Sequence, residues 1–127
     1  MQKGYIALIT VLIVMAVVLT TASTVALLGI GEAQSGFSIF RGEDTLSFVE
    51  GCAEDAMLKA RVNASYNGGT ITRPEGSCAI TVVSKIGSPT VTWTINITTA
   101  DTLYKRTVEI VFERSETGIT LTSWKEI

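Results

Sequence analysis

The sequence predicts an α+β fold in which one long helix packs on an antiparallel sheet, and three patterns support this prediction. The front of the chain is a long apolar run without a charged side chain. The middle repeats apolar residues at spacings of three and four, which is typical of a helix with one buried face. The back alternates apolar and polar residues, as a strand does when one face is buried. A helix and a sheet that each have one apolar face can bury it against the other.

The apolar run is long enough to cross a membrane. The chain has 127 residues, of which 46% are hydrophobic, a high share for a soluble domain. No charged residue occurs between Lys3 and Glu32. A helix needs roughly 20 residues to span a bilayer core about 30 Å thick, and residues 5–28 exceed that length. The polar side chains of this run are hydroxyls that can bond back to helix carbonyls: Thr10, Thr20, Thr21, Ser23 and Thr24.

Three interpretations of this front stay open. A secretory signal peptide would use Lys3 as its basic region and residues 5–19 as its apolar region, with cleavage near residues 20–22. The apolar run resumes at residues 25–28, however, which a removed signal does not require. A plain single-span anchor needs only Lys3 and the apolar run. Both the anchor and the third interpretation place the Lys3 end in the cytoplasm.

The third interpretation rests on Lys3-Gly4-Tyr5, which resembles the leader junction of type IV pilins and of the pseudopilins of type II secretion. The resemblance implies that a prepilin peptidase removes residues 1–4 as a leader, and that the new N-terminal residue, Tyr5, is methylated. Gly4 lacks a side chain, which would let the peptidase grip the backbone. The resemblance further implies a single pass through the inner (cytoplasmic) membrane, an extracytoplasmic head, and other pilin or pseudopilin subunits as filament partners.

One position departs from the family pattern. Most major pilins carry a glutamate at the fifth mature position, which is Ile9 in this chain. In the family this glutamate is thought to pair with a neighbouring subunit's N-terminal amine, because an unpaired charge in the apolar filament core is costly. Thr10 can accept a hydrogen bond but cannot neutralise a charge. Minor, tip-forming members such as the K-type pseudopilins often lack the acid, so the resemblance favours a minor or tip subunit.

The helix is expected in two halves, a membrane half over residues 5–31 and an amphipathic half over residues 32–67. Gly29, Gly31 and Gly36 lie near the boundary, and each costs a helix roughly 1 kcal/mol relative to alanine. They indicate either a short linker after the membrane helix or, by the resemblance, a helix that melts or bends inside a filament. The expected apolar stripe of the second half consists of Leu46, Val49, Ala53, Ala56, Ala60 and Ala64.

The end of this helix and the sheet head are expected from turn residues and from period two. Residues 67–69, Asn-Gly-Gly, predict the helix stop. The head is expected over residues 77–127 as a four-stranded meander, because its connections at residues 86–89, 99–102 and 115–118 are short. The expected strands are residues 79–85, 91–98, 104–114 and 119–124. Simple alternation places Trp124 on the polar face, so it marks either a subunit contact or a bulge that re-aims it.

Two cysteines bear on the stability of this head. Cys52 lies beside the apolar stripe of the helix, and Cys78 opens the first expected strand. A disulfide between them would suit an oxidising exterior. Two buried free thiols are the alternative.

The sequence favours no chemistry. It contains no histidine, and its two cysteines cannot close a zinc site alone. No catalytic, cofactor-binding or metal site is expected, and the acidic pairs at residues 43–44 and 54–55 are interpreted as a solvated helix face. Interleaved charges with a net −2 argue against nucleic-acid binding. Residues 63–65 and 96–98 match the N-glycosylation triplet, which often arises by chance in a threonine-rich chain.

Overall fold

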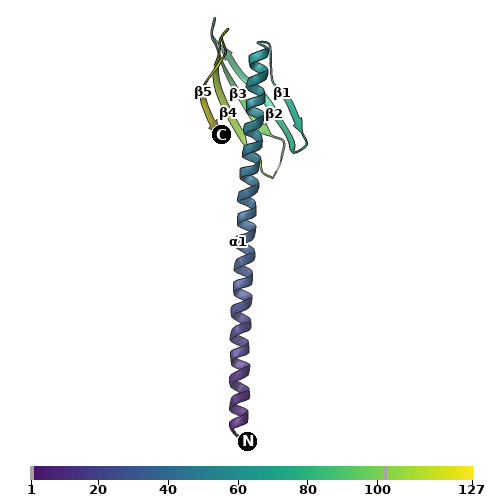
Figure 1. The fold of residues 1–127 in the computed structure, drawn as a ribbon, viewed down its shortest axis with the longest axis vertical. Coiled ribbons are helices and arrows are strands. Elements are labelled where there is room, and N and C mark those ends of the chain that lie inside the picture. The colour runs from purple at the N-terminus through teal and green to yellow at the C-terminus, as the bar shows by residue number, and fades with distance from the viewer. Residues whose placement is uncertain (1, 102) are drawn as a thin grey trace. The chain divides into compact units, whose positions relative to one another are not determined.

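The computed structural model describes residues 2–101 and 103–127, which form one helix and five strands (Figure 1). The elements are α1 (Gln2–Val62), β1 (Gly69–Arg73), β2 (Gly76–Ile86), β3 (Val91–Thr99), β4 (Thr107–Arg114) and β5 (Ile119–Glu126). The predicted α+β class is confirmed. The chain forms two compact units, one up to Phe40 and one over Arg41–Ile127.

The first unit is helical throughout residues 2–40, and every residue in it is exposed. α1 passes through Gly29, Gly31 and Gly36 without a break, so the predicted linker after the membrane half is wrong. Each glycine weakens the helix locally, but a helix already formed on both sides needs no new nucleus and gains one hydrogen bond per added residue. The bend or melting that the resemblance implies in a filament stays a prediction.

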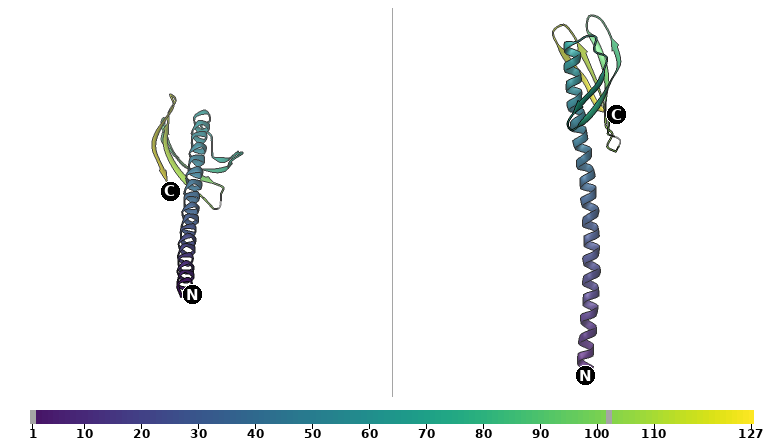
Figure 2. Two further views of the ribbon diagram at one scale, coloured as in Figure 1. Left: turned by 60° about the horizontal axis from the view of Figure 1, so that its bottom comes forward. Right: turned by 90° about the vertical axis from the view of Figure 1, so that its right-hand side faces the viewer.

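In the second unit, residues 41–62 of α1 cover one face of the sheet (Figure 2). The helical side of the core consists of Val49, Cys52, Ala53, Ala56 and Ala60, all fully buried. The predicted stripe is therefore confirmed up to Ala60, with Leu46 half-buried beside it. Three of its members are alanines, and their short side chains let the helix approach the sheet closely.

α1 ends at Val62, earlier than the predicted residue 67, and Ala64 lies exposed beyond it. The cause is Asn63, whose side-chain Oδ1 accepts the N–H of Ser65 at 2.8 Å. Its carbonyl oxygen accepts the N–H of Tyr66 at 3.1 Å, which closes a turn. Asparagine side chains compete with helical hydrogen bonds in this way. The Asn-Gly-Gly stop therefore marks the approach to the first strand and not the end of the helix.

The sheet has five strands in the order β1-β2-β3-β4-β5, and all neighbours are antiparallel. The predicted meander is confirmed, but its count of four strands is wrong, and the sheet begins at Gly69 instead of residue 77. β1 was missed because only Ile71 faces the core in it, so it has too few apolar residues to show a period. β1 forms a hairpin with β2, in which Arg73 lies opposite Gly76 across the turn at residues 74–75.

Strand limits also differ at the hairpin between β3 and β4. The sequence predicts Thr99 in a turn and a strand from Tyr104, whereas Thr99 ends β3 and β4 starts at Thr107. The buried hydroxyl of Thr99 accepts the N–H of Arg106 at 3.0 Å, and the N–H of Thr99 donates to the carbonyl of Arg106 at 3.0 Å. These bonds close the loop at residue 106. Thr102, in the predicted turn, lies outside the described residues.

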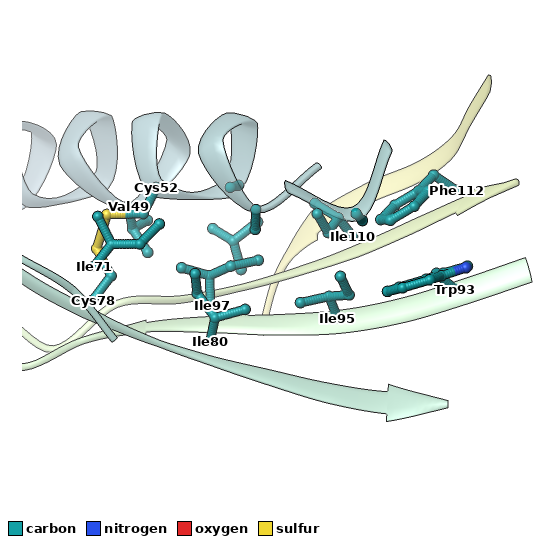
Figure 3. Close-up of a cluster of buried hydrophobic side chains, with 14 residues drawn as sticks. Val49, Cys52, Ile71, Cys78, Ile80, Trp93, Ile95, Ile97, Ile110 and Phe112 are labelled. Carbon is teal, nitrogen blue, oxygen red and sulfur yellow. A yellow bond between two sulfur atoms is a disulfide. The ribbon is translucent and has the colours of Figure 1, made fainter. Parts of the chain in front are cut away.

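The inward faces of β3 and β4 are as predicted, and the core is drawn in Figure 3. Their inward residues are Trp93, Ile95, Ile97, Val108, Ile110 and Phe112, each at most 1% exposed. The rings of Trp93 and Phe112 stack with centroids 5.8 Å apart.

A bulge in β5 turns Trp124 toward this core. Leu121 pairs with Phe112 and Ser123 pairs with Val111, so Thr122 is an extra residue without a partner position. Trp124 then lies opposite the buried Ile110 and packs against the core. Of the two interpretations of Trp124, the bulge is confirmed. A single inserted residue reverses the faces of a strand because side chains alternate with a period of two.

Candidate functional site

The first candidate site is the apolar front of α1, which is long and apolar enough to span a membrane. Its large side chains all point away from the chain, with Tyr5 66% exposed and Leu27 71% exposed. In water such a surface would be strongly unfavourable, since each fully exposed large apolar side chain forgoes about 1.5–3 kcal/mol of burial free energy. Such a surface favours an apolar environment over water.

The hydroxyl groups of this segment do not oppose that burial. Thr10 Oγ1 donates to the carbonyl oxygen of Ala7 at 2.8 Å. The same kind of bond, three or four residues back along the helix and 2.8–3.1 Å long, is made by Thr20, Thr21, Ser23 and Thr24. The prediction that these hydroxyls bond back to the helix is confirmed. A satisfied hydroxyl avoids most of the cost of a bare polar group in hydrocarbon.

The predicted processing residues Gly4 and Tyr5 both lie in the first turns of α1. A Cβ atom added at Gly4 would meet nothing within 4 Å, so neither packing nor backbone conformation within the chain requires glycine there. Glycine at a helical position lowers helix stability relative to alanine. Gly29, Gly31 and Gly36 lie in equally open space, so the structure does not distinguish Gly4 from the other glycines of this segment.

Ile9 and Thr10 follow within the same helix. Ile9 is 37% exposed, and it offers no group that could neutralise a neighbouring amine. Thr10 already uses its hydroxyl proton in the bond to Ala7, which leaves it only as an acceptor. Along the sequence, the first acidic residue after Met1 is Glu32.

The second candidate site is the pair Cys52 and Cys78, which the structure joins as a disulfide (Figure 3). Their Cα atoms are 6.4 Å apart, and both residues are fully buried. The alternative of two free thiols is wrong. The bond ties the head half of α1 to β2 within the core, so it supports the fold and offers no reactive thiol.

Sequence reasoning missed the polar groups that hold the end of α1 on the sheet. Arg114, the last residue of β4, donates from Nε to the carbonyl oxygen of Ala60 at 2.9 Å and from Nη2 to that of Arg61 at 3.4 Å. Lys85 donates to the carbonyl oxygen of Tyr66 and lies 4.1 Å from the ring centroid of Trp93. No pattern in the sequence indicates the bonds to these carbonyl groups, because every residue carries a carbonyl group and the partners lie 19–54 residues apart.

Residues 2–101 and 103–127 contain no group of three or more histidine, cysteine or acidic side chains that could hold a metal ion. Of the acidic pairs at residues 43–44 and 54–55, Asp55 is held in an ion pair with Arg73 of β1. Comparison of the chain with family models, with curated proteins and with solved structures finds no match.

Proposed function

We propose that this chain is a minor pilin or pseudopilin, a membrane-anchored structural subunit of a type IV pilus or a related secretion filament. The observation that carries the proposal is α1. It is one uninterrupted helix whose uncharged first half exposes its apolar side chains and whose second half covers an antiparallel sheet. Pilins have this layout, and Lys3-Gly4-Tyr5 stands where their leader is cut.

The chemistry of α1 supports a helix that exchanges lipid for other subunits. The first half has no charged side chain between Lys3 and Glu32, so it can leave the bilayer and enter a bundle of like helices without stripping water from a charge. In either environment its apolar surface is covered. Lys3 favours the cytoplasmic side for the N-terminus, and the Cys52–Cys78 disulfide suits an oxidising exterior for the head.

The proposed place in the filament is its tip or its starting point. Each subunit added below another brings a new N-terminal amine into the apolar core, and an acid nearby would neutralise it. Ile9 does not supply this acid. A subunit with no other subunit ahead of it has no such requirement, and it needs only an apolar helix to enter the bundle and a head to contact the subunits below.

The experiment that tests the proposal determines the N-terminus of the protein taken from its own cells. We expect a chain that begins with N-methylated Tyr5 and lacks residues 1–4. The variant Gly4→Val should accumulate as the uncleaved precursor, whereas Tyr5→Phe, which keeps an aromatic ring at the new terminus, should still be processed. A mature chain that begins near Ser23 would establish a secretory signal peptide instead. An uncut chain in the wild type would leave a single-span anchor for an extracytoplasmic binding domain.

A further inference from the structure

We propose that Asn63 is the acceptor of an N-linked glycan, attached to the head at the point where α1 ends. The triplet Asn63-Ala64-Ser65 has the acceptor pattern, in which the residue two positions on carries a hydroxyl. All three residues are exposed, as are Arg61 and Val62 before them. Glycan transfer needs an acceptor on an accessible, bent part of the chain, and this triplet meets both requirements.

The bend is set by the asparagine itself. Asn63 Oδ1 accepts the N–H of Ser65 at 2.8 Å, and the Asn63 carbonyl oxygen accepts the N–H of Tyr66 at 3.1 Å. The first bond is an Asx turn, which brings the residue with the recognition hydroxyl back toward the asparagine side chain. It also places the amide oxygen in a hydrogen bond, while the amide nitrogen Nδ2, the atom that would be modified, belongs to an exposed residue.

The second triplet of the chain, Asn96-Ile97-Thr98, provides an internal contrast. It lies in β3, the middle strand, where Asn96 is paired between Thr81 and Glu109. Its Oδ1 is buried and has no hydrogen-bond partner among the described residues. Its hydroxyl residue, Thr98, is already bonded to Thr107 at 3.1 Å between the two hydroxyl oxygens. The same motif is therefore accessible at one position and locked into a sheet at the other.

The substrate that this site would take is a glycan carried on a polyprenyl phosphate or diphosphate in the membrane. A bond forms between Asn63 Nδ2 and the anomeric carbon of the first sugar. The bond from that carbon to the phosphate oxygen breaks, and its electron pair leaves with the lipid phosphate. The amide nitrogen loses one proton to a base of the transferase. The reaction needs the head on the extracytoplasmic side, so this inference rests on the orientation given under the proposed function.

Mass spectrometry of the full-length protein, purified from the membranes of its own cells, tests the inference. We expect the peptide that contains Asn63 to carry an added glycan mass, and the peptide that contains Asn96 to have the mass of its sequence. Asn63→Gln and Ser65→Ala should each remove the added mass completely. Ser65→Thr, which keeps the hydroxyl, should retain it, and Asn96→Gln should leave it unchanged. Because residues 63 and 65 are exposed, tryptophan fluorescence should show the same folded head in the variants at these two positions.

Protease digestion of cells stripped of every layer outside the cytoplasmic membrane, before and after lysis of that membrane, separates the two ways of failing. A head that is digested before lysis but carries an unmodified Asn63 would overturn the glycan assignment and leave the proposed function standing. A head that is digested only after lysis would overturn both. An added mass that persists in Asn63→Gln, or that lies on Asn96, would also overturn the assignment.

Discussion

Gly68 and Gly87 occupy backbone conformations that side chains rarely adopt. Their φ angles are +88° and +114°. A Cβ atom at Gly68 would collide with the carbonyl oxygen of Ile80, and one at Gly87 would collide with that of Thr90. In both cases the obstacle is backbone, which cannot move aside as the end of a flexible side chain can. Gly68 thus lets the chain leave α1 and run close beside β2.

Replacement of Gly68 by alanine should destabilise the head by about 2 kcal/mol or more, from backbone strain and collision together. The measurement is urea unfolding of the full chain in detergent, followed by the fluorescence of Trp93 and Trp124, which both lie in the head. Gly51→Ala is the matched control. Its Cβ would make an ordinary contact of 3.6 Å with Arg73, and alanine is the better helix former, so stability should rise by about 0.5–1 kcal/mol. Equal effects at the two positions would contradict the conformational argument.

α1 and the sheet are fastened at separate points along the head. The Cys52–Cys78 disulfide joins α1 to β2, and the side chain of Arg114 binds the carbonyl groups at the end of α1. The last carbonyl groups of any helix lack partners within the helix, and Arg114 supplies donors to two of them. The ion pair of Asp55 with Arg73 adds a contact to β1, but it is partly exposed and contributes little.

Loss of the disulfide should lower the stability of the head by about 3–4 kcal/mol, the chain-entropy value for a cross-link of 26 residues. The double variant Cys52→Ser, Cys78→Ser and the wild type treated with a reductant should unfold at the same lower urea concentration. The untreated wild type should withstand more urea than either. A reductant that leaves the wild-type midpoint unchanged while the head unfolds reversibly would show that the cross-link does not contribute to stability.

The variant Arg114→Met should lower the free energy of unfolding of the head by about 1–2 kcal/mol. Methionine keeps most of the apolar stem but leaves two helix carbonyl groups without their charged donor. Arg61→Met is the control, because it removes the same charge from an exposed position at the same helix end. Urea unfolding should separate the two variants. If Arg61→Met costs as much as Arg114→Met, the effect belongs to general charge near the helix end and not to the hydrogen bonds.

The chain consists of two compact units with different surfaces. The unit up to Phe40 supplies an apolar helical surface, and the unit over Arg41–Ile127 supplies a cross-linked, water-facing head. In the proposed filament, the first unit's apolar surface would enter the bundle and the head would contact the subunits below. The lack of an acid at Ile9 then limits which neighbours it accepts, if the proposed function holds.

We therefore expect few copies of this chain per filament, and no filaments from the purified chain alone. Each like neighbour would bring an unpaired N-terminal amine into an apolar core, at a cost of several kcal/mol. Quantitative mass spectrometry of filaments measures the number of copies per filament. Electron microscopy of the purified processed subunit shows whether it forms filaments alone. Filaments in which this chain is the most abundant subunit would contradict the proposed place at the tip and would be compatible with the proposed pilin function.

Local pattern was enough to determine the class of the fold and most of its core. Residues 5–28 are an apolar helix, and the stripe of Val49, Ala53, Ala56 and Ala60 is buried, because periodicity alone decides which face of an element is apolar. The alternation over residues 91–98 and 108–112 placed their inward side chains correctly for the same reason. The cysteine pairing could only be proposed, since the separation of two residues along the sequence does not determine their distance in the folded chain.

Tertiary structure decided the features in which local signals are weak or conflict. β1 has a single inward residue, Ile71, and is a strand because it pairs with β2. Trp124 faces the core because one inserted residue in the pairing with β4 reverses the alternation. Of the two glycosylation triplets, identical in pattern, one lies in an open turn and the other in the middle of the sheet. For β1, Trp124 and Asn96 the outcome depends on pairing with a neighbouring strand, and such pairing leaves no mark in the segment's own residues.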